Sequence, residues 1–183
     1  MATVTYLTRE DLEAGLEEIS RSPKDAGVLE MIVGRPEVNE RQVLTEGELT
    51  LTDGLVGDNW KRRGRSPSLD RQLTIMNARV IALVAQDRAR WEFAGDQLFI
   101  DLDLSAANLP AGTQLTIGPA IVEVTPPPHT GCGKFVERFG SDAKAFVNAP
   151  ERKDLHLRGI NAKVVQAGVI RVGDVVSKTS RRT

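Results

Sequence analysis

Apolar and polar positions alternate over short stretches in most of the chain, and a period of two predicts β-strands. Strands are expected at residues 28–33, 41–52, 73–76, 96–109, 113–126 and 159–178. Turns within these stretches are expected at Glu46-Gly47, at residues 110–112 and at Gly168. The pattern therefore predicts a protein built mainly from strands.

A helical period appears in three places. The first helix is expected between Thr8, a candidate N-cap, and Pro23, and the second follows Asn77, another residue suited to an N-cap. The third helical stretch covers residues 133–150 and is interrupted at Gly140. The apolar face of the second helix is expected to include Val80, Ile81, Val84, Ala85 and Trp91.

The order of these elements predicts the fold class. The helices do not alternate regularly with the strands, which argues against a doubly wound sheet. We expect a mainly β (α+β) fold, a barrel or sandwich with peripheral helices. A single domain is expected over residues 1–183, with an N-terminal helical segment at 1–27 and a frayed tail at 177–183.

Composition excludes several classes of protein. The formal net charge is -1 over 183 residues, which does not suit a general nucleic-acid or membrane-surface binder. The acidic N-terminus has no long apolar run, so neither a signal peptide nor a membrane span is expected. One cysteine cannot form an internal disulfide, and we expect a cytoplasmic protein.

That cysteine stands in an unusual setting, "VTPPPHTGCGKF". Gly131 and Gly133 leave the approach to Cys132 open, while His129 and Lys134 supply nearby nitrogen groups. Positive charge and helix N–H groups favour the reactive thiolate, so Cys132 is a candidate catalytic or ligand residue, with His129 orienting or deprotonating it.

Plainer interpretations remain open for the same residues. A lone cysteine is often an inert, buried side chain. His129 would then be an ordinary loop histidine. A zinc site formed by Cys132, His129 and His156 is a weaker hypothesis, because their spacing matches no strong zinc motif.

Four separated segments carry a resemblance to a known family: "DGLVGDNW", "RQLTIMNARVIAL", "AANLPAGTQLTIGPAIVEVTPPPHTGCGKF" and "RGINAKVVQAGVIRVGD". Together they resemble a stand-alone MOSC domain, the module at the C-terminus of molybdenum cofactor sulfurases, over about residues 28–176. The resemblance implies a closed β-barrel of the MOSC type with peripheral helices. Two departures are Asn59-Trp60, where the family often has Arg-His, and Ala107, where cofactor-binding relatives often have a charged residue.

The resemblance also implies a ligand, the molybdenum cofactor, with Cys132 as the ligand of molybdenum or the carrier of sulfur. Because this cofactor is anionic, cations and amide groups become candidate contacts. The candidates are Arg62, Arg63, Arg71, Asn108, Lys134 and Arg158. The alternatives are a solvated basic loop for the arginines of residues 61–69, a turn for Asn108 and an acid partner such as Asp154 for Arg158.

Four functions remain open at this point. The first is a molybdenum-dependent oxidoreductase that reduces small N-hydroxylated substrates. No flavin or iron–sulfur motif is visible, so this enzyme would need an external electron donor. The second is a metal-free sulfur carrier that receives sulfane sulfur on Cys132 from a pyridoxal-phosphate-dependent cysteine desulfurase. A binding barrel without chemistry and a Cys-His hydrolase complete the set.

Overall fold

The computed structural model describes residues 4–179. Its strands are β1 Ala26–Gly34, β2 Gln42–Leu44, β3 Glu46–Thr50, β4 Gly54–Leu55, β5 Leu73–Asn77, β6 Leu98–Asp101, β7 Gln114–Ile117, β8 Ala120–Pro128, β9 Ile160–Gln166, β10 Gly168–Arg171 and β11 Val175–Lys178. The α-helices are α1 Arg9–Ala14, α2 Leu16–Ser20, α3 Ala78–Ala85, α4 Gly133–Phe139 and α5 Ser141–Val147. Short 3₁₀ helices are η1 Trp60–Arg62, η2 Leu69–Arg71, η3 Arg88–Ala94 and η4 Pro150–Leu155.

Over these residues the large sheet closes into a barrel. Its strand order is β11-β7-β8-β9-β5-β6-β1, and β1 returns to pair with β11. The β5–β6 pair is parallel, whereas the other pairs are antiparallel. Strand β2 pairs with the C-terminal end of β1, outside the closed barrel. Strands β10, β3 and β4 form a small second sheet. The predicted closed, mainly β barrel is confirmed.

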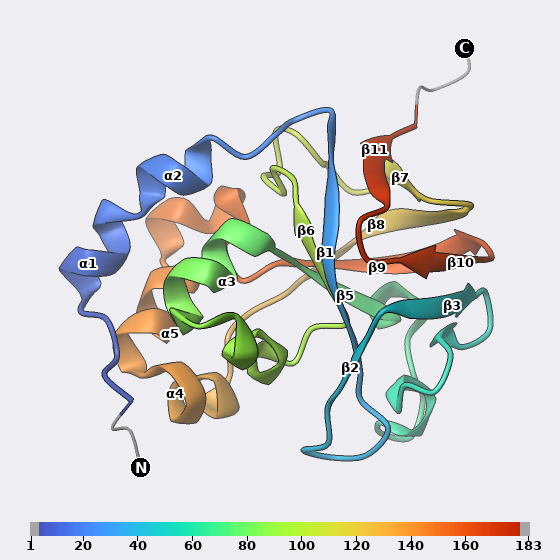
Figure 1. Cartoon of the computed structure of the whole chain (residues 1–183), viewed down its shortest axis with the longest axis horizontal. Helices are drawn as coiled ribbons and strands as arrows, with labels where there is room; N and C mark the ends of the chain where they lie inside the picture. The colour runs from blue at the N-terminus through green and yellow to red at the C-terminus, as the bar shows by residue number, and fades with distance from the viewer. Residues whose placement is uncertain (1–3, 180–183) are drawn as a thin grey trace.

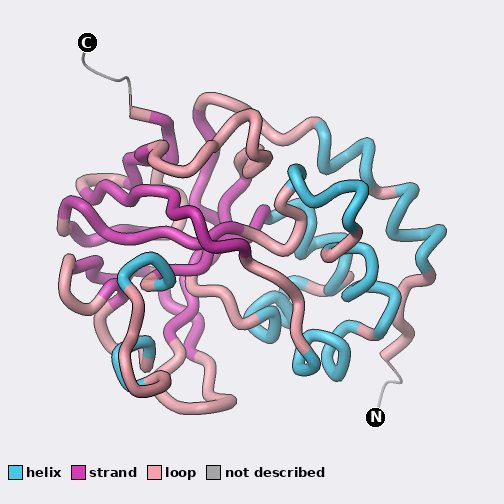
Figure 2. Tube along the Cα trace, turned by 180° about the vertical axis from the view of Figure 1, so that it is seen from behind, coloured by secondary structure: helices cyan, strands magenta, loops and turns pink. Residues whose placement is uncertain are grey.

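The helices gather on one side of the barrel, and the strands occupy the other side of the molecule (Figures 1 and 2). Strand β1 contributes side chains to both layers, because successive side chains of a strand point to opposite faces. Ile32 packs into the barrel core, whereas Met31 and Val33 pack against the helices. The same division separates Ile75 from Met76. Two apolar cores therefore share one set of strands.

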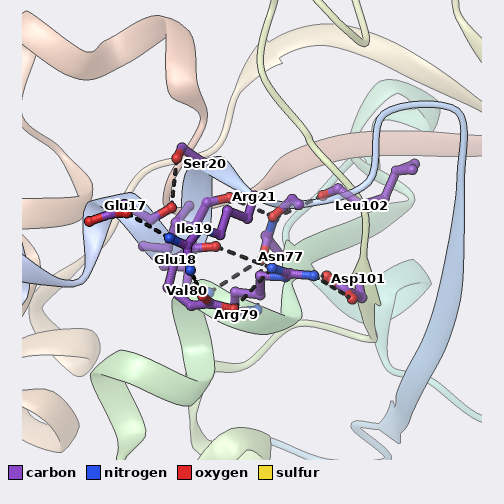
Figure 3. A network of polar contacts seen from close by, with 11 residues as sticks. Glu17, Glu18, Ile19, Ser20, Arg21, Asn77, Arg79, Val80, Asp101 and Leu102 are labelled. Atoms are coloured by element: carbon purple, nitrogen blue, oxygen red, sulfur yellow. Dashed lines mark hydrogen bonds and ion pairs between the residues drawn. The ribbon is translucent and has the colours of Figure 1, made fainter.

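A polar network fastens the N-terminal helices to the barrel (Figure 3). The side chain of Asn77 caps α3 by accepting hydrogen bonds from the N–H groups of Arg79 and Val80. Its Nδ2 donates to the Leu102 carbonyl at 2.8 Å and to Ser22 Oγ at 2.9 Å, just beyond α2. Arg79 adds ion pairs to Asp101 on β6 and to Glu18 on α2. The predicted helix at Asn77 is confirmed, and its cap also holds the layers together.

The predicted first helix is divided into α1 and α2 at Gly15. A Cβ at this position would lie 2.4 Å from Cδ2 of Leu83 on α3. A larger residue at position 15 would therefore require the Leu83 side chain to move. Within residues 4–179, no helix is long and apolar enough to cross a membrane.

Two predictions for the middle of the chain, a turn at Gly47 and a strand end at Pro126, differ from the structure. Gly47 lies inside β3 and is not a turn, because β3 pairs with β10 and β4 while β2 pairs with β1. A Cβ on Gly47 would lie 2.7 Å from Leu55 of β4, so glycine permits close packing there. The stretch of strand expected at residues 113–126 does not end there, because the prolines at 126–128 continue it. They remain in β8, where the register with β9 shifts between Val124 and Pro128.

The C-terminal prediction was also partly wrong. Gly168 begins β10, and a further strand, β11, follows it. Ser177 and Lys178 are part of β11, which closes the barrel, so they do not belong to a frayed tail. The rest of the expected tail, residues 180–183, lies outside the described residues.

Candidate functional site

A hollow of ≈ 320 Å³ lies where the helical layer meets the end of the barrel. We call it the Cys132 cleft. The groups that line it include Arg35, Arg41, Arg63, Thr74, Gly95, His129, Cys132, Lys134, Phe135, Arg138 and Arg158. A second hollow of ≈ 350 Å³, the Arg71 hollow, shares Arg35, Arg63, Thr74 and His129 with it. The Arg71 hollow adds Trp60, Ser66, Ser68, Arg71 and Asn161. The two hollows therefore form one basic, hydroxyl-bearing surface.

Cys132 is exposed and stands at the N-cap of α4. Partial burial raises the pKa of its thiol. The backbone N–H groups of Phe135 and Lys134 and the charge of Arg158 outweigh that effect, so the pKa lies below its ordinary value. The inert, buried interpretation of Cys132 is wrong, because the sulfur is accessible and its surroundings favour the thiolate.

Behind the cysteine lies a buried charge cluster that joins Asp96, His129 and Arg158. The fully buried carboxylate of Asp96 is 2.8 Å from His129 Nε2 and 2.6 Å from Arg158 Nη1. Burial alone would raise the pKa of Asp96, but its interactions with Arg158 and His129 lower it to about 2. Asp96 is therefore ionised at neutral pH and compensates the charge of the buried arginine.

Arg158 is held rigidly in this cluster. Its Nη2 donates to the Ala94 carbonyl at 2.9 Å, and its guanidinium lies 5.0 Å from the ring centroid of Phe135. Its Nε is buried and has no hydrogen-bond partner among residues 4–179. Asp96 is the acid partner of Arg158, in place of the Asp154 considered from the sequence.

His129 is neutral at pH 7. Burial lowers its pKa, the charge of Arg158 lowers it further, and these effects exceed the opposing effect of Asp96. Because Asp96 is ionised, it accepts the proton on Nε2, which leaves Nδ1 as the unprotonated nitrogen. Among the described side chains, no hydrogen bond joins His129 to Cys132. The partner of His129 is Asp96 and not the thiol.

A second buried ion pair joins Arg35, which lines both hollows, to Asp58. The guanidinium makes two contacts of 2.8 Å to the two carboxylate oxygens, and its Nη1 donates to the Gly95 carbonyl at 2.9 Å. Asp58 also accepts from the backbone N–H groups of Arg35 and Trp60. Asp58 therefore anchors the arginine that opens into both hollows.

The remaining cations of this surface differ from Arg35 and Arg158 in their ion pairing. Arg41, Arg63, Arg71, Lys134 and Arg138 form no ion pair with any carboxylate of residues 4–179. Burial lowers the pKa of Arg63, and the charge of Arg35 lowers it further. An anion entering the cleft would find these cations uncompensated.

Not every predicted site residue lies here. The cleft and its adjoining hollow contain Cys132, His129, Arg63, Arg71, Lys134 and Arg158. Arg62 turns away and pairs with Glu37 at 2.9 Å. Asn108 closes a turn, where its Nδ2 donates to the carbonyls of Lys24 and Asp103 and its Oδ1 accepts from Lys178. Neither residue lines the two hollows.

The zinc hypothesis is not supported within the described range. His156 Nδ1 lies 2.8 Å from the Leu104 carbonyl. Residues 4–179 contain no cluster of three histidine, cysteine or acidic side chains that could hold a metal ion.

Sequence reasoning missed Arg35, Arg41, Asp96 and Arg138. Arg35 and Arg41 come from the segment between β1 and β2, Asp96 from the turn before β6 and Arg138 from α4, and only the fold brings these segments together. Two signals were present. Arg35 follows the buried strand β1 directly, and Asp96 stands between Gly95 and β6.

Fold and cleft together define a class: a β-barrel protein with one exposed, activated thiol in a cationic cleft. The chain belongs to the MOSC domain family, whose model matches residues 62–177. MOSC domains bind the molybdenum cofactor or act in related sulfur chemistry. The predicted family is confirmed, and β1 of the barrel lies outside the matched range.

Solved structures share the fold. The YuaD protein from Bacillus subtilis is similar with a TM-score of 0.63 and 18% identity, covering 86% of this chain and 97% of that chain. YiiM from Escherichia coli is similar with a TM-score of 0.55 and 20% identity, covering 85% of this chain and 71% of that chain. YiiM from Geobacillus stearothermophilus is similar with a TM-score of 0.54 and 15% identity, covering 85% of this chain and 76% of that chain. A comparison with curated proteins found no match.

Proposed function

We propose that this protein binds the molybdenum cofactor across the Cys132 cleft and the Arg71 hollow, and reduces a small N-hydroxylated substrate there. The observation that carries the proposal is the activated thiol of Cys132 in a cleft with several uncompensated cations. A soft thiolate suits molybdenum, and fixed arginines suit a phosphate.

The residues present fit this cofactor. Arg63 and Arg71 line a hollow with two serine side chains, Ser66 and Ser68, a donor set suited to a phosphate. The buried Nε of Arg158, which has no hydrogen-bond partner in the described part of the chain, supplies a further donor beside the cleft. Cys132 stands in the connected cleft and would be the ligand of the metal.

When bound, the cofactor supplies a metal centre that exchanges two electrons. In the overall reaction, two electrons from an external donor and two protons break the N–O bond, which yields the N–H product and water. Arg158 and Arg35, each fixed by a buried carboxylate, hold the walls of the cleft in place. Because the reaction consumes protons, His129 would act as a relay, with its unprotonated Nδ1 taking up a proton from solvent and delivering it to the substrate oxygen.

Metal and pterin analysis tests the proposal. Wild-type protein purified from a host that makes the cofactor should contain stoichiometric molybdenum and pterin. Arg63→Gln and Arg71→Gln should lower both contents, whereas Arg171→Gln, an exposed control on β10, should not. Cys132→Ser should weaken retention of the metal more than that of the pterin.

The sulfur-carrier alternative also uses the exposed thiol and makes opposite predictions. It requires protein without molybdenum from the same host. It also requires Cys132 to gain the mass of one sulfur atom after treatment with cysteine and a pyridoxal-phosphate-dependent desulfurase. Absence of molybdenum from the purified protein would overturn the proposed function.

A further inference from the structure

Two arginines of the Cys132 cleft converge on a single glycine. A Cβ built on Gly95 would lie 3.5 Å from Arg41 Nη2 and 3.9 Å from Arg138 Nη1. Arg41 comes from the segment between β1 and β2, and Arg138 from α4. The backbone of Gly95 has φ 90°, a conformation that favours glycine, so no side chain fills the space between the guanidinium groups.

The two guanidinium groups are held in place, but no acid neutralises them. Arg138 Nη1 donates to the Phe93 carbonyl at 2.7 Å, and Arg41 Nη1 donates to the Glu40 carbonyl at 2.6 Å. Neither arginine has a carboxylate within ion-pair distance in the described part of the chain. The Nε of Arg41 is buried without a hydrogen-bond partner there.

Like charges held together cost free energy unless an anion joins them. The fold compensates Arg35 and Arg158 in the same cleft with one buried carboxylate each. For Arg41 and Arg138 the described residues provide none. Burial lowers the pKa of Arg41, and the neighbouring charges of Arg138 and Arg35 lower it further.

This pair is separate from the cations that suit the cofactor phosphate. Arg63 and Arg71 line the Arg71 hollow, which does not include Arg41 or Arg138. The pair lines the cleft that holds Cys132, where Lys134 adds a third positive charge fixed to Asn39 Oδ1 at 3.1 Å.

We infer that Arg41 and Arg138 form a second anion subsite, which binds the carboxylate or a similar anionic group of the substrate itself. The inference rests on the proposed function and narrows its substrate class to anionic N-hydroxylated compounds. Two arginines at a fixed separation would select substrates that carry the charge at a set distance from the N–O bond.

Paired ligands test the inference by equilibrium binding. Isothermal titration would compare benzamidoxime, which is neutral, with 4-carboxybenzamidoxime, which is anionic. Wild-type protein should bind the anionic ligand at least about tenfold more tightly. Arg41→Gln and Arg138→Gln should each remove most of that preference and leave the affinity for benzamidoxime unchanged. Arg171→Gln should keep the preference.

Molybdenum content, measured on the same preparations, separates the two ideas. Unchanged content in Arg41→Gln and Arg138→Gln supports a substrate subsite. Loss of cofactor from these variants would overturn the inference, because the pair would then hold the cofactor phosphate. Equal affinity of wild-type protein for the two ligands would overturn it as well. If no preparation contains molybdenum, the proposed function fails, and the ratio of affinities still decides whether the anion subsite exists.

Discussion

The arginines of the Cys132 cleft fall into two groups that the fold treats differently. Arg35 and Arg158 are buried, and each contacts a fully buried carboxylate. Arg41 and Arg138 are half-buried, and among residues 4–179 their hydrogen bonds go to backbone carbonyls and not to a carboxylate. A buried ion cannot remain without a partner, whereas a cation beside solvent can. The first group therefore stabilises the fold, and the second group remains available to a ligand.

The largest effect on stability is expected when Arg35 or Arg158 loses its buried carboxylate partner. Asp96→Asn should lower the free energy of unfolding by about 3–5 kcal/mol, because it leaves Arg158 buried and uncompensated. Urea denaturation followed by the fluorescence of the buried Trp60 and Trp91 measures this change.

A control and a rescue sharpen that result. Glu37→Gln breaks the exposed pair with Arg62 and should cost less than about 1 kcal/mol. The double variant Asp96→Asn/Arg158→Met removes both charges and should recover part of the loss. Equal costs for Asp96→Asn and Glu37→Gln would contradict the distinction between buried and exposed pairs.

Acid should weaken the same buried pair in the wild-type protein. The pKa of Asp96 falls from its ordinary value of 3.8 to about 2 on folding. The folded state therefore binds fewer protons in this range, and stability present above about pH 4 is lost as pH falls towards 2. This group contributes about 2 kcal/mol. The lowered pKa of His129 acts in the same direction below its ordinary value of 6.5.

Denaturation across this pH range measures that contribution. Asp96→Asn should show a flatter dependence of unfolding free energy on pH between 4 and 2 than wild type. Identical slopes would mean that Asp96 has no special role in acid stability.

A smaller effect is expected at the thiol. In protein freed of cofactor, alkylation of Cys132 by iodoacetamide should have a pH midpoint below that of an ordinary cysteine, because the helix N–H groups and Arg158 favour the thiolate. Mass spectrometry measures the rate, and no other cysteine in the chain competes. Asp96→Asn/Arg158→Met, which removes the arginine charge, should move the midpoint upwards. A midpoint at the ordinary value in both proteins would mean that the cleft does not activate this thiol.

The smallest effect belongs to the second group. Arg41→Gln removes one of two facing like charges and should change the unfolding free energy by at most about 0.5 kcal/mol, in the direction of greater stability. The same denaturation assay applies. A loss as large as that of Asp96→Asn would show that Arg41 is a structural residue and would erase the contrast between the groups.

Local patterns predicted much of the fold, because they depend on short-range chemistry. Asn77 was identified as an N-cap from its residue type and the apolar spacing that follows, and its hydrogen bonds confirm it. Gly47 was placed in a turn from its residue type alone. Its actual role in β3, beside Leu55, depends on a strand pairing that neighbouring residues do not encode.

Residues of the candidate site, too, were predicted only where neighbouring residues in the sequence pointed to them. Cys132 was found because its flanking glycines, histidine and lysine are adjacent in the chain. The basic loop led to Arg63 but also to Arg62, which pairs with Glu37. The side chains of adjacent residues in one loop can point in different directions. Asp96 was missed because its partners, His129 and Arg158, are distant in sequence.

The sequence by itself determined the mainly β class and the cysteine at the centre of the proposed chemistry, since these depend on periodicity and on adjacent residue types. It also indicated the family, through the resemblance of four separated segments. The tertiary structure alone decided which arginines are compensated and which are free. That outcome depends on burial and on distances between remote segments, as when η3, α4 and the loop after β1 meet around Gly95.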